Sequence, residues 1–175
     1  MYYKSSYTSP LGQIAIVSDD KTIKGVWFAD QKYFGSQYVM QTMAAAETSV
    51  IIQVKNWLDA YFAGENPTLD PNVLDPEVTS YRKEILNALI NVPYGQTTSY
   101  KELADKVALT TPGKKGSARA AGGAVGHNPI SILIPCHRVV ATNGALTGYA
   151  GGIDRKIALL ALEGIDQSKL DNHKV

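Results

Sequence analysis

The first thirty residues alternate apolar and polar positions in three short stretches. Residues 2–8, 13–18 and 22–28 follow the two-residue period of β-strands, and they are separated by the turn sequences Ser9-Pro10-Leu11-Gly12 and Asp19-Asp20. Because the connections are tight, adjacent strands must run in opposite directions. The pattern therefore predicts a small antiparallel meander.

A helical period replaces this alternation from Val50 onward. Apolar side chains recur every three or four residues until Gly64 ends the helix. The stretch that follows, up to Pro76, is rich in Pro, Asp and Asn and has no regular period. We place a domain boundary near its end, with an N-terminal α/β domain over 1–78 and a C-terminal domain over 79–175.

The second half of the chain has the pattern of several short helices. The apolar spacing predicts four of them, over residues 76–90, 100–107, 118–126 and from Gly151-Gly152 to Glu163. Ser99 with Glu102 forms a capping box for the second helix, Ser117 caps the third, and Gly164 stops the last. The second and third helices, joined by the loop 109–116, are typical of a helix-turn-helix. The predicted fold class is α+β, a small N-terminal antiparallel sheet with helices followed by a mostly helical domain.

The third of these helices is almost bare of side chains. It reads Ser-Ala-Arg-Ala-Ala-Gly-Gly-Ala-Val-Gly, and each interior glycine costs about 1 kcal/mol relative to alanine. Gly122 and Gly123 either allow another backbone to approach closely or keep the helix slim enough for a narrow slot. The minor groove of DNA, about 6 Å wide, is such a slot. Arg119 is the one long cation on this helix and is able to fill a gap in the base stack.

The composition narrows the chemistry that the chain can perform. Hydrophobic residues make up 45% of the chain, enough for a core, yet no apolar run approaches the ~20 residues of a membrane helix. A single cysteine excludes a disulfide framework and a cysteine-rich zinc site, and it indicates a reducing compartment. The N-terminus has no signal-peptide pattern, so we expect a cytoplasmic protein that is monomeric in solution.

The net charge of +1 divides unevenly between the two halves. Residues 1–78 carry five Lys and nine Asp or Glu, a charge of −4, whereas residues 79–175 carry twelve Lys or Arg and seven Asp or Glu, a charge of +5. A basic half favours contact with a polyanion such as a nucleic acid. Many ordinary domains carry a similar charge, so the charge alone does not identify a partner.

The cysteine lies in the segment Ile134-Pro135-Cys136-His137-Arg138-Val139-Val140. A free thiol has a pKa of about 8.5 and reacts as the thiolate, so a reactive cysteine needs a base. His137 is adjacent in sequence, and because neighbouring side chains usually point apart, we expect a bridging water to carry the proton. Glu163 is the candidate carboxylate behind the imidazole. Each residue also has a purely structural explanation. Cys136 would be a small buried hydrophobe, His137 a core histidine with satisfied hydrogen bonds, and Glu163 a solvated residue at a helix end.

Five segments of the second half together resemble a known family. They are Arg119-Ala120-Ala121-Gly122-Gly123-Ala124, Asn128-Pro129, Ile132 to Val140, Gly148-Tyr149-Ala150-Gly151-Gly152 and Leu162-Glu163-Gly164. This succession, within about residues 79–164, resembles the O6-alkylguanine-DNA alkyltransferases, or methylated-DNA–protein-cysteine methyltransferases. The N-terminal half resembles them in general form. The resemblance implies a ribonuclease H-like N-terminal domain and a winged-helix-like C-terminal domain.

The resemblance also implies direct DNA repair. The alkyl group of O6-alkylguanine, and of O4-alkylthymine as well, would pass to Cys136, which restores the base and inactivates the protein after one turnover without any cofactor. The damaged nucleotide would be flipped out of double-stranded DNA, the expected partner. Arg119 would take the place of the flipped base, while Tyr100 would help to rotate the nucleotide and serve N3 of the base.

The resemblance assigns roles to individual positions. The catalytic residues that it implies are Cys136, His137, Glu163 and Asn128, the last as a hinge between the recognition helix and the active-site loop. The residues that it implies at the DNA are Arg119, Tyr100, Ser99, Ala120, Lys114 and Lys115. The residues that it implies in the substrate pocket are Val139, Tyr149, Ala150 and Val125, with the carbonyls of Cys136 and Val139 accepting the exocyclic amine.

Some positions depart from the pattern of this family. Ala150 stands where many relatives have serine, which leaves a backbone N–H to donate to O6. Lys114 and Lys115 lie in a long loop and are either phosphate contacts or solvated. Some relatives bind structural zinc in the N-terminal domain, but here that domain has neither Cys nor His, so no metal is expected.

Two other classes of protein compete with this interpretation. One is a non-enzymatic module that binds alkylation lesions, whose members keep the arginine and the helix-turn-helix but lack the cysteine. The other is a Cys-His hydrolase, which would turn over repeatedly. The presence of Cys136 argues against the first class, and the number of turnovers distinguishes the second.

Overall fold

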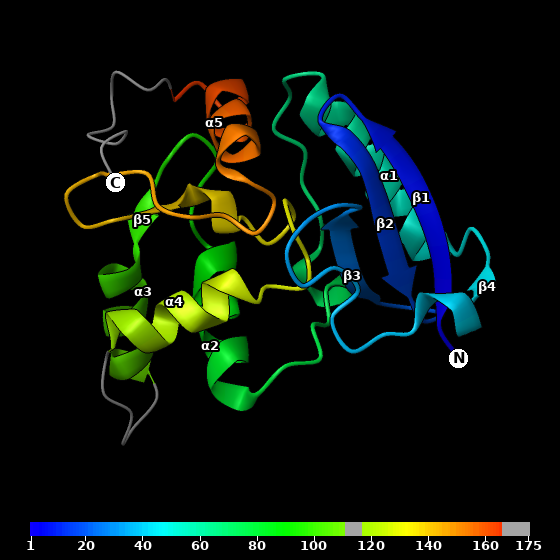
Figure 1. Cartoon of the computed structure of the whole chain (residues 1–175), viewed down its shortest axis with the longest axis horizontal. Helices are drawn as coiled ribbons and strands as arrows, with labels where there is room; N and C mark the ends of the chain where they lie inside the picture. The colour runs from blue at the N-terminus through cyan, green and yellow to red at the C-terminus, as the bar shows by residue number, and fades with distance from the viewer. Residues whose placement is uncertain (111–116, 166–175) are drawn as a thin grey trace. The chain divides into compact units, whose positions relative to one another are not determined.

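The computed structural model describes residues 1–110 and 117–165. Figure 1 shows the chain, which forms two compact units. The first unit comprises Met1–Glu77 together with Pro129–Ser131, and the second comprises Val78–Asn128 and the chain from Ile132 onward. No sequence pattern indicated that Pro129–Ser131 would join the first unit.

The first unit is built on the predicted meander. Strands β1 (Tyr3–Ser9), β2 (Gly12–Ser18) and β3 (Ile23–Phe28) pair antiparallel, and the short β4 (Ala44–Ala45) adds parallel to β1. The strand order is β3-β2-β1-β4. All six residues of β3 are buried, whereas Ser6 and Thr8 of β1 are exposed. The three strands expected from the alternation of the sequence are confirmed.

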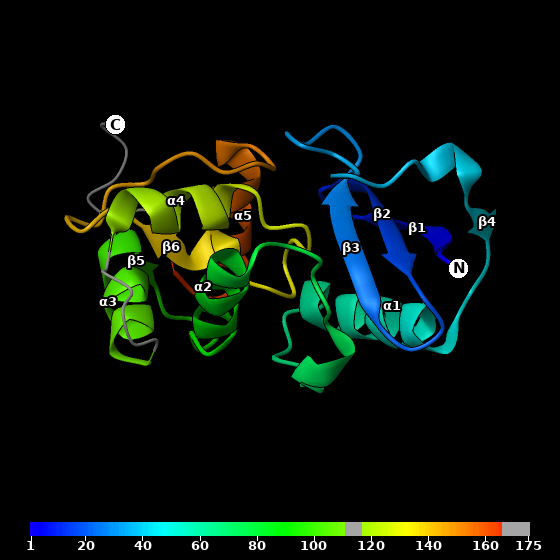
Figure 2. The ribbon, with the colours of Figure 1, turned by 90° about the horizontal axis from the view of Figure 1, so that it is seen from below.

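Helix α1 (Ser49–Phe62) lies along one face of this sheet, as Figures 1 and 2 show. The Thr48 side chain accepts a hydrogen bond from the backbone N–H of Ile51 and caps its first turn. Val54 and Leu58 of its apolar stripe are fully buried, and Gly64 with φ 91° ends the helix as predicted. Two 3₁₀ turns, η1 (Met40–Thr42) and η2 (Pro71–Val73), complete the unit.

The second unit is mostly helical. Its elements in chain order are α2 (Ser80–Ile90), β5 (Thr98–Ser99), α3 (Tyr100–Thr110), α4 (Ala118–Gly126), the 3₁₀ turn η3 (Cys136–Arg138), β6 (Val139–Val140) and α5 (Ile153–Leu162). Helices α2, α3 and α4 pack on one another around a core of Leu, Ile, Val and Ala side chains. Strands β5 and β6 pair parallel, with Thr98 opposite Val139. The helix-turn-helix pair α3–α4 is therefore attached directly to the segment that follows the cysteine.

Two predicted helix limits are wrong. Helix α2 begins at Ser80 rather than near Pro76, because the Thr79 side chain accepts a hydrogen bond from Arg82 N at 3.4 Å and sets the first turn. Helix α3 continues to Thr110, three residues beyond the predicted end, because the sequence has no helix-breaking residue there before Pro112.

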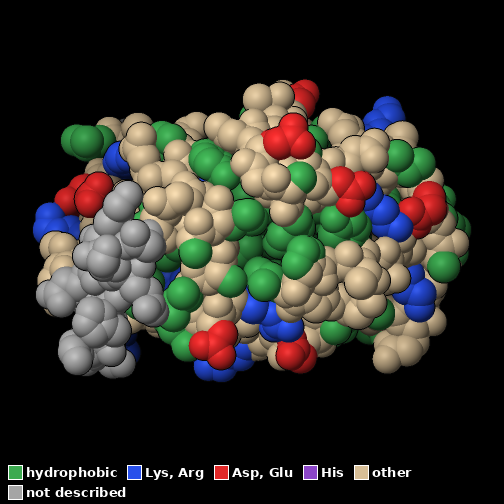
Figure 3. Space-filling view, turned by 90° about the horizontal axis from the view of Figure 1, so that it is seen from above, with side chains coloured by type: hydrophobic (Ala, Val, Ile, Leu, Met, Phe, Trp, Pro, Cys, Tyr) green, Lys and Arg blue, Asp and Glu red, His purple; other side chains and the backbone are tan. Residues whose placement is uncertain are grey.

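Charged side chains are interspersed by sign on the surface shown in Figure 3. The difference in charge between the two halves of the sequence thus does not gather into a field of one sign on this face. Among residues 1–110 and 117–165, no helix is both long enough and apolar enough to cross a membrane.

Candidate active site

The cysteine follows a tightly bent, buried loop. Ile132 has a left-handed backbone with φ 71°, an uncommon conformation for a β-branched residue. Pro135, at φ −80° and ψ 65°, is the centre of an inverse γ-turn in which Cys136 N donates to Ile134 O at 2.8 Å. The fixed φ of proline suits this turn. The turn delivers the chain into η3 with Cys136 as its first residue.

Asn128 closes this loop from its other end. Its Nδ2 donates to Ile134 O at 2.9 Å, and the side chain is buried. A hydrogen bond from the Asn128 side chain to the thiol also lowers the pKa of Cys136. One amide therefore holds both the loop and the sulfur, at the position predicted to be a hinge.

The Cys136 side chain is buried, with 5% of the residue exposed. Burial, the largest influence, raises the pKa of the Cys136 thiol, because a buried thiolate loses its hydration. Hydrogen bonds from Asn128 and Tyr149 and the positive charge of Lys156 act in the opposite direction. The resting sulfur is thus a neutral thiol surrounded by groups that favour its anion.

His137 and Glu163 form a buried pair. His137 Nε2 lies 2.7 Å from Glu163 Oε2, and both side chains are fully shielded from solvent. Burial lowers the pKa of His137, while Glu163 raises it in part. Because the Glu163 carboxylate only accepts hydrogen bonds, Nε2 of His137 carries the proton of the neutral imidazole. Nδ1 of His137 is therefore the nitrogen that can accept a second proton.

Arg138 holds the carboxylate of Glu163 in place. Its Nε donates to Oε1 at 2.8 Å and its Nη2 to Oε2 at 3.0 Å, a two-pronged contact that fixes the plane of the carboxylate. Its Nη1 donates to Val92 O at 2.7 Å, and the guanidinium lies over the Tyr94 ring at 5.8 Å. Gly95 N completes the set by donating to Oε1 at 3.1 Å. The carboxylate thus has four donors around it.

Both halves of the chain match one family. Residues 1–76 match the ribonuclease-like domain of 6-O-methylguanine DNA methyltransferase, and residues 80–165 match its DNA binding domain. The chain belongs to this family. It is 39% identical to the methylated-DNA–protein-cysteine methyltransferase of Mycobacterium tuberculosis (strain H37Rv), over 93% of each chain. The enzyme of the same name from Methanosarcina acetivorans is also 39% identical, over 94% of this chain and 99% of that one.

A solved structure agrees with this assignment. The crystal structure of the Mycobacterium tuberculosis enzyme in complex with DNA superimposes with a TM-score of 0.77 at 36% identity, covering 97% of this chain and 94% of that one. The α+β class and the ribonuclease-like first domain expected from the sequence are confirmed.

Two short strands position the predicted DNA residues of this methyltransferase-family chain. Tyr100 begins α3 directly after β5, and its hydroxyl lies 2.6 Å from Thr147 Oγ1. Ser99, also predicted at the DNA, is buried, and its hydroxyl accepts a hydrogen bond from Glu102 N at 3.1 Å. Ser99 therefore has a local role in capping α3. Its predicted contact with DNA stays a prediction.

Helix α4 presents its slim face to open space. Arg119 and Ala120 are exposed. A Cβ built on Gly122 would meet the Tyr100 ring at 3.8 Å, an ordinary contact, and one on Gly123 would meet nothing within 4 Å. Among the residues that the structure describes, no backbone approaches these glycines closely, so the packing explanation does not apply. Lys114 and Lys115 lie outside the described residues.

The predicted pocket residues differ in their burial and in their effect on the sulfur. Tyr149 acts to lower the pKa of the Cys136 thiol, Val125 and Val139 are buried, and Ala150 is half-buried. The carbonyls of Cys136 and Val139 already accept hydrogen bonds from Val139 N and Lys156 Nζ. A carbonyl oxygen has two lone pairs, so each can still accept a further donor.

Sequence reasoning missed three residues of this site. Arg138 lies within the cysteine motif, but nothing in the sequence indicated that its guanidinium would hydrogen-bond to Glu163. Lys156 lies on an amphipathic helix, where a lysine predicts a solvated face, yet it is fully buried. Thr147 lies in an irregular segment without any motif.

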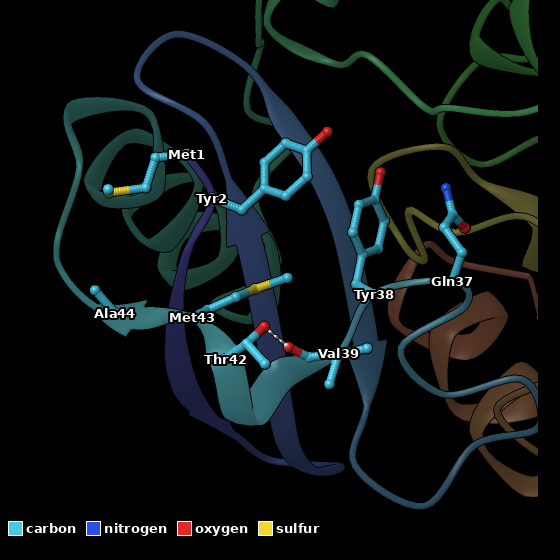
Figure 4. Close-up of a pocket in the computed structure, with 8 residues that line it drawn as sticks. All are labelled: Met1, Tyr2, Gln37, Tyr38, Val39, Thr42, Met43 and Ala44. Atoms are coloured by element: carbon cyan, nitrogen blue, oxygen red, sulfur yellow. Dashed lines mark hydrogen bonds between the residues drawn. The ribbon is translucent and has the colours of Figure 1, made fainter.

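The first unit has a pocket of its own, shown in Figure 4. It encloses about 460 Å³ and includes the rings of Tyr2 and Tyr38, whose hydroxyls both donate to Glu77 Oε1. Its lining has no Cys, His, Asp or Glu side chain. Across the described part of the chain, no cluster of three or more His, Cys, Asp or Glu side chains is arranged to hold a metal ion.

Proposed function

We propose that this protein repairs alkylated DNA by transferring the alkyl group from O6 of guanine, and from O4 of thymine, to its own Cys136. The observation that carries the proposal is a lone buried thiol whose surrounding groups favour its anion, in a chain of the 6-O-methylguanine DNA methyltransferase family. Such a reagent needs access to DNA and a reduced thiol, which fits a cytoplasmic protein.

The thiol proton leaves first. A bridging water carries it from Cys136 to His137, whose lowered pKa keeps the imidazole neutral and able to accept a proton near neutral pH. Glu163, on the opposite nitrogen, stabilises the imidazolium that results. Arg138 keeps that carboxylate in position.

The thiolate then attacks the alkyl carbon. A carbon–sulfur bond forms, the bond between that carbon and O6 breaks, and its electron pair stays with the guanine, which takes a proton at N3 from Tyr100. Burial raises the pKa of Cys136 because it destabilises the charged thiolate. The product thioether carries no charge, so burial does not destabilise it in this way. Because a thioether is stable and no group regenerates the thiol, each molecule acts once.

The exposed, slim face of α4 supports a DNA-binding role for this helix. Because Arg119 is the one long side chain among glycines and alanines on this face, the backbone of α4 can approach a narrow groove, and Arg119 can enter the base stack when a nucleotide is flipped out. This role of Arg119 predicts that Arg119→Ala slows repair of duplex DNA far more than reaction with the free base O6-benzylguanine. Equal slowing of both reactions would contradict it.

Mass spectrometry tests the proposed transfer. After incubation with duplex DNA that contains O6-methylguanine, the protein should gain one methyl group on Cys136 and then stop, and Cys136→Ala should gain none. Tight binding with an unmodified Cys136 would instead indicate a lesion-binding module. Repeated turnover would indicate a hydrolase.

A further inference from the structure

A chain of polar contacts leads from Tyr100 through Thr147 to Lys156 in α5. The Tyr100 hydroxyl lies 2.6 Å from Thr147 Oγ1, and Lys156 Nζ donates to the same oxygen at 3.4 Å. The ammonium also donates to Thr147 O at 3.3 Å and to Val139 O at 2.6 Å. Thr147 Oγ1 thus stands between a phenol and a cation.

Lys156 is an unusual residue to find at the end of such a chain. It is fully buried, although burying an ammonium is costly. Burial lowers the pKa of Lys156 to about 8, while the charge of the Cys136 thiolate raises it in part. The titratable groups that interact with its charge are Cys136 and His137, both in η3. Lys156 is therefore able to give up a proton near neutral pH.

The charge of Lys156 matches the state of the sulfur. Once the thiol proton has left, the thiolate of Cys136 and the ammonium of Lys156 stabilise one another. Alkylation turns the sulfur into a neutral thioether, so the buried ammonium loses the charge that favoured it. Loss of this partner lowers the pKa of Lys156 further, because burial then acts unopposed. The ammonium becomes a proton donor at the moment when guanine needs a proton.

We propose that Thr147 is a positioning residue that relays a proton from Lys156 to Tyr100 as guanine departs. This inference rests on the proposed function. The proton of Tyr100 passes to guanine N3, the proton of Thr147 Oγ1 passes to the Tyr100 oxygen, and one proton of Lys156 Nζ passes to Thr147 Oγ1. Lys156 is left neutral and regains a proton from water, so both hydroxyl groups end as they began.

The relay avoids a negative charge on the Tyr100 oxygen, which burial disfavours. Burial raises the pKa of Tyr100, and the Cys136 thiolate raises it too, so a lasting tyrosinate is unfavourable there. The hydroxyl of Thr147 is the group that lowers the pKa of Tyr100, because it donates to the phenolate oxygen. A proton that follows at once through Thr147 keeps the phenol neutral.

Two electrophiles distinguish the relay from a structural role. Methyl transfer from O6-methylguanine needs a proton on the leaving group, whereas alkylation of Cys136 by iodoacetamide releases iodide and needs none. Thr147→Val removes the hydroxyl and keeps the shape of the side chain, and Thr147→Ser keeps the hydroxyl. Thr147→Ala serves as a second variant without the hydroxyl, and thermal unfolding shows that each variant is folded.

In single-turnover reactions, Thr147→Val and Thr147→Ala should lose about tenfold or more in methyl transfer, the scale of general acid catalysis. Their rates with iodoacetamide should stay close to that of the wild type, and Thr147→Ser should retain most of its methyl transfer. Equal losses with both electrophiles, an unchanged rate in Thr147→Val, or a Thr147→Ser variant as slow as Thr147→Val would each overturn the relay. A wild-type protein that gains no methyl group would overturn the proposed function itself.

Discussion

Glu163→Gln tests how the buried carboxylate organises the site. The change keeps the shape of the side chain but removes its charge and turns one oxygen into an NH₂ group. At Oε1 that group would face Arg138 Nε and Gly95 N, two obligate donors. At Oε2 it would face Arg138 Nη2 and His137 Nε2, of which only the imidazole can become an acceptor. In either orientation of the amide, its NH₂ group therefore faces at least one other hydrogen-bond donor.

The loss also leaves the guanidinium of Arg138 buried without a counter-charge. Breaking a buried pair by removing one partner costs about 3–5 kcal/mol. For a protein of this size, each kcal/mol shifts the unfolding midpoint by roughly 2–4 °C, so we expect Glu163→Gln to unfold about 6–20 °C below the wild type. Calorimetry at neutral pH measures this shift directly.

A double-mutant cycle separates the pair from its surroundings. Arg138→Met together with Glu163→Gln removes both charges, so the double variant should be more stable than the sum of the two single losses predicts. A Glu163→Gln variant within about 1 kcal/mol of the wild type, the typical net worth of one ordinary hydrogen bond, would refute the buried clamp. Strict additivity of the two substitutions would refute the pairing.

Three further outcomes follow from the described geometry. Lys156→Met should raise the pKa of Cys136 further, so iodoacetamide should modify it more slowly than the wild type at pH 7, with the difference vanishing at strongly alkaline pH. Burial lowers the pKa of His137 below its ordinary 6.5, so the contribution of the neutral imidazole to stability is complete above about pH 6.5 and is lost as the pH falls through the folded-state pKa. Urea midpoints should therefore fall from pH 7 to pH 5 by more in the wild type than in His137→Gln. Gly25→Ala should cost about 1–3 kcal/mol in urea unfolding, since its Cβ would lie 1.8 Å from the buried Trp27 ring; an unchanged midpoint would contradict that contact.

The regular elements could be predicted from the sequence because their causes are local. The alternation along β1 to β3, the apolar stripe of α1 and the Ser117 cap of α4 each depend on residues within one element. The start of α2 was missed because Pro76, a residue that suits the first turn of a helix, was preferred over Thr79 as its beginning.

The chemistry was predictable only where it lay within a motif. Cys136 and His137 are adjacent, and Glu163 lies at the end of a recognisable helix, so they could be proposed together. The four donors around Glu163 come from positions 95, 137 and 138, and the burial of Lys156 depends on contacts with Val139 and Thr147. No period or spacing encodes contacts between segments so far apart.

The short return of Pro129–Ser131 to the first unit has a consequence for dividing the chain. Val26 N donates to Pro129 O at 2.8 Å and Ser131 N donates to Val26 O at 2.9 Å, so these residues extend the sheet beside β3. After a nick following Glu77, this β-augmentation contact, an isolated bridge with two backbone hydrogen bonds, would run between the two fragments. Fragments 1–77 and 78–175, expressed separately, are accordingly suited to reassemble as a split protein in which refolding of the sheet restores the loop that leads to the cysteine.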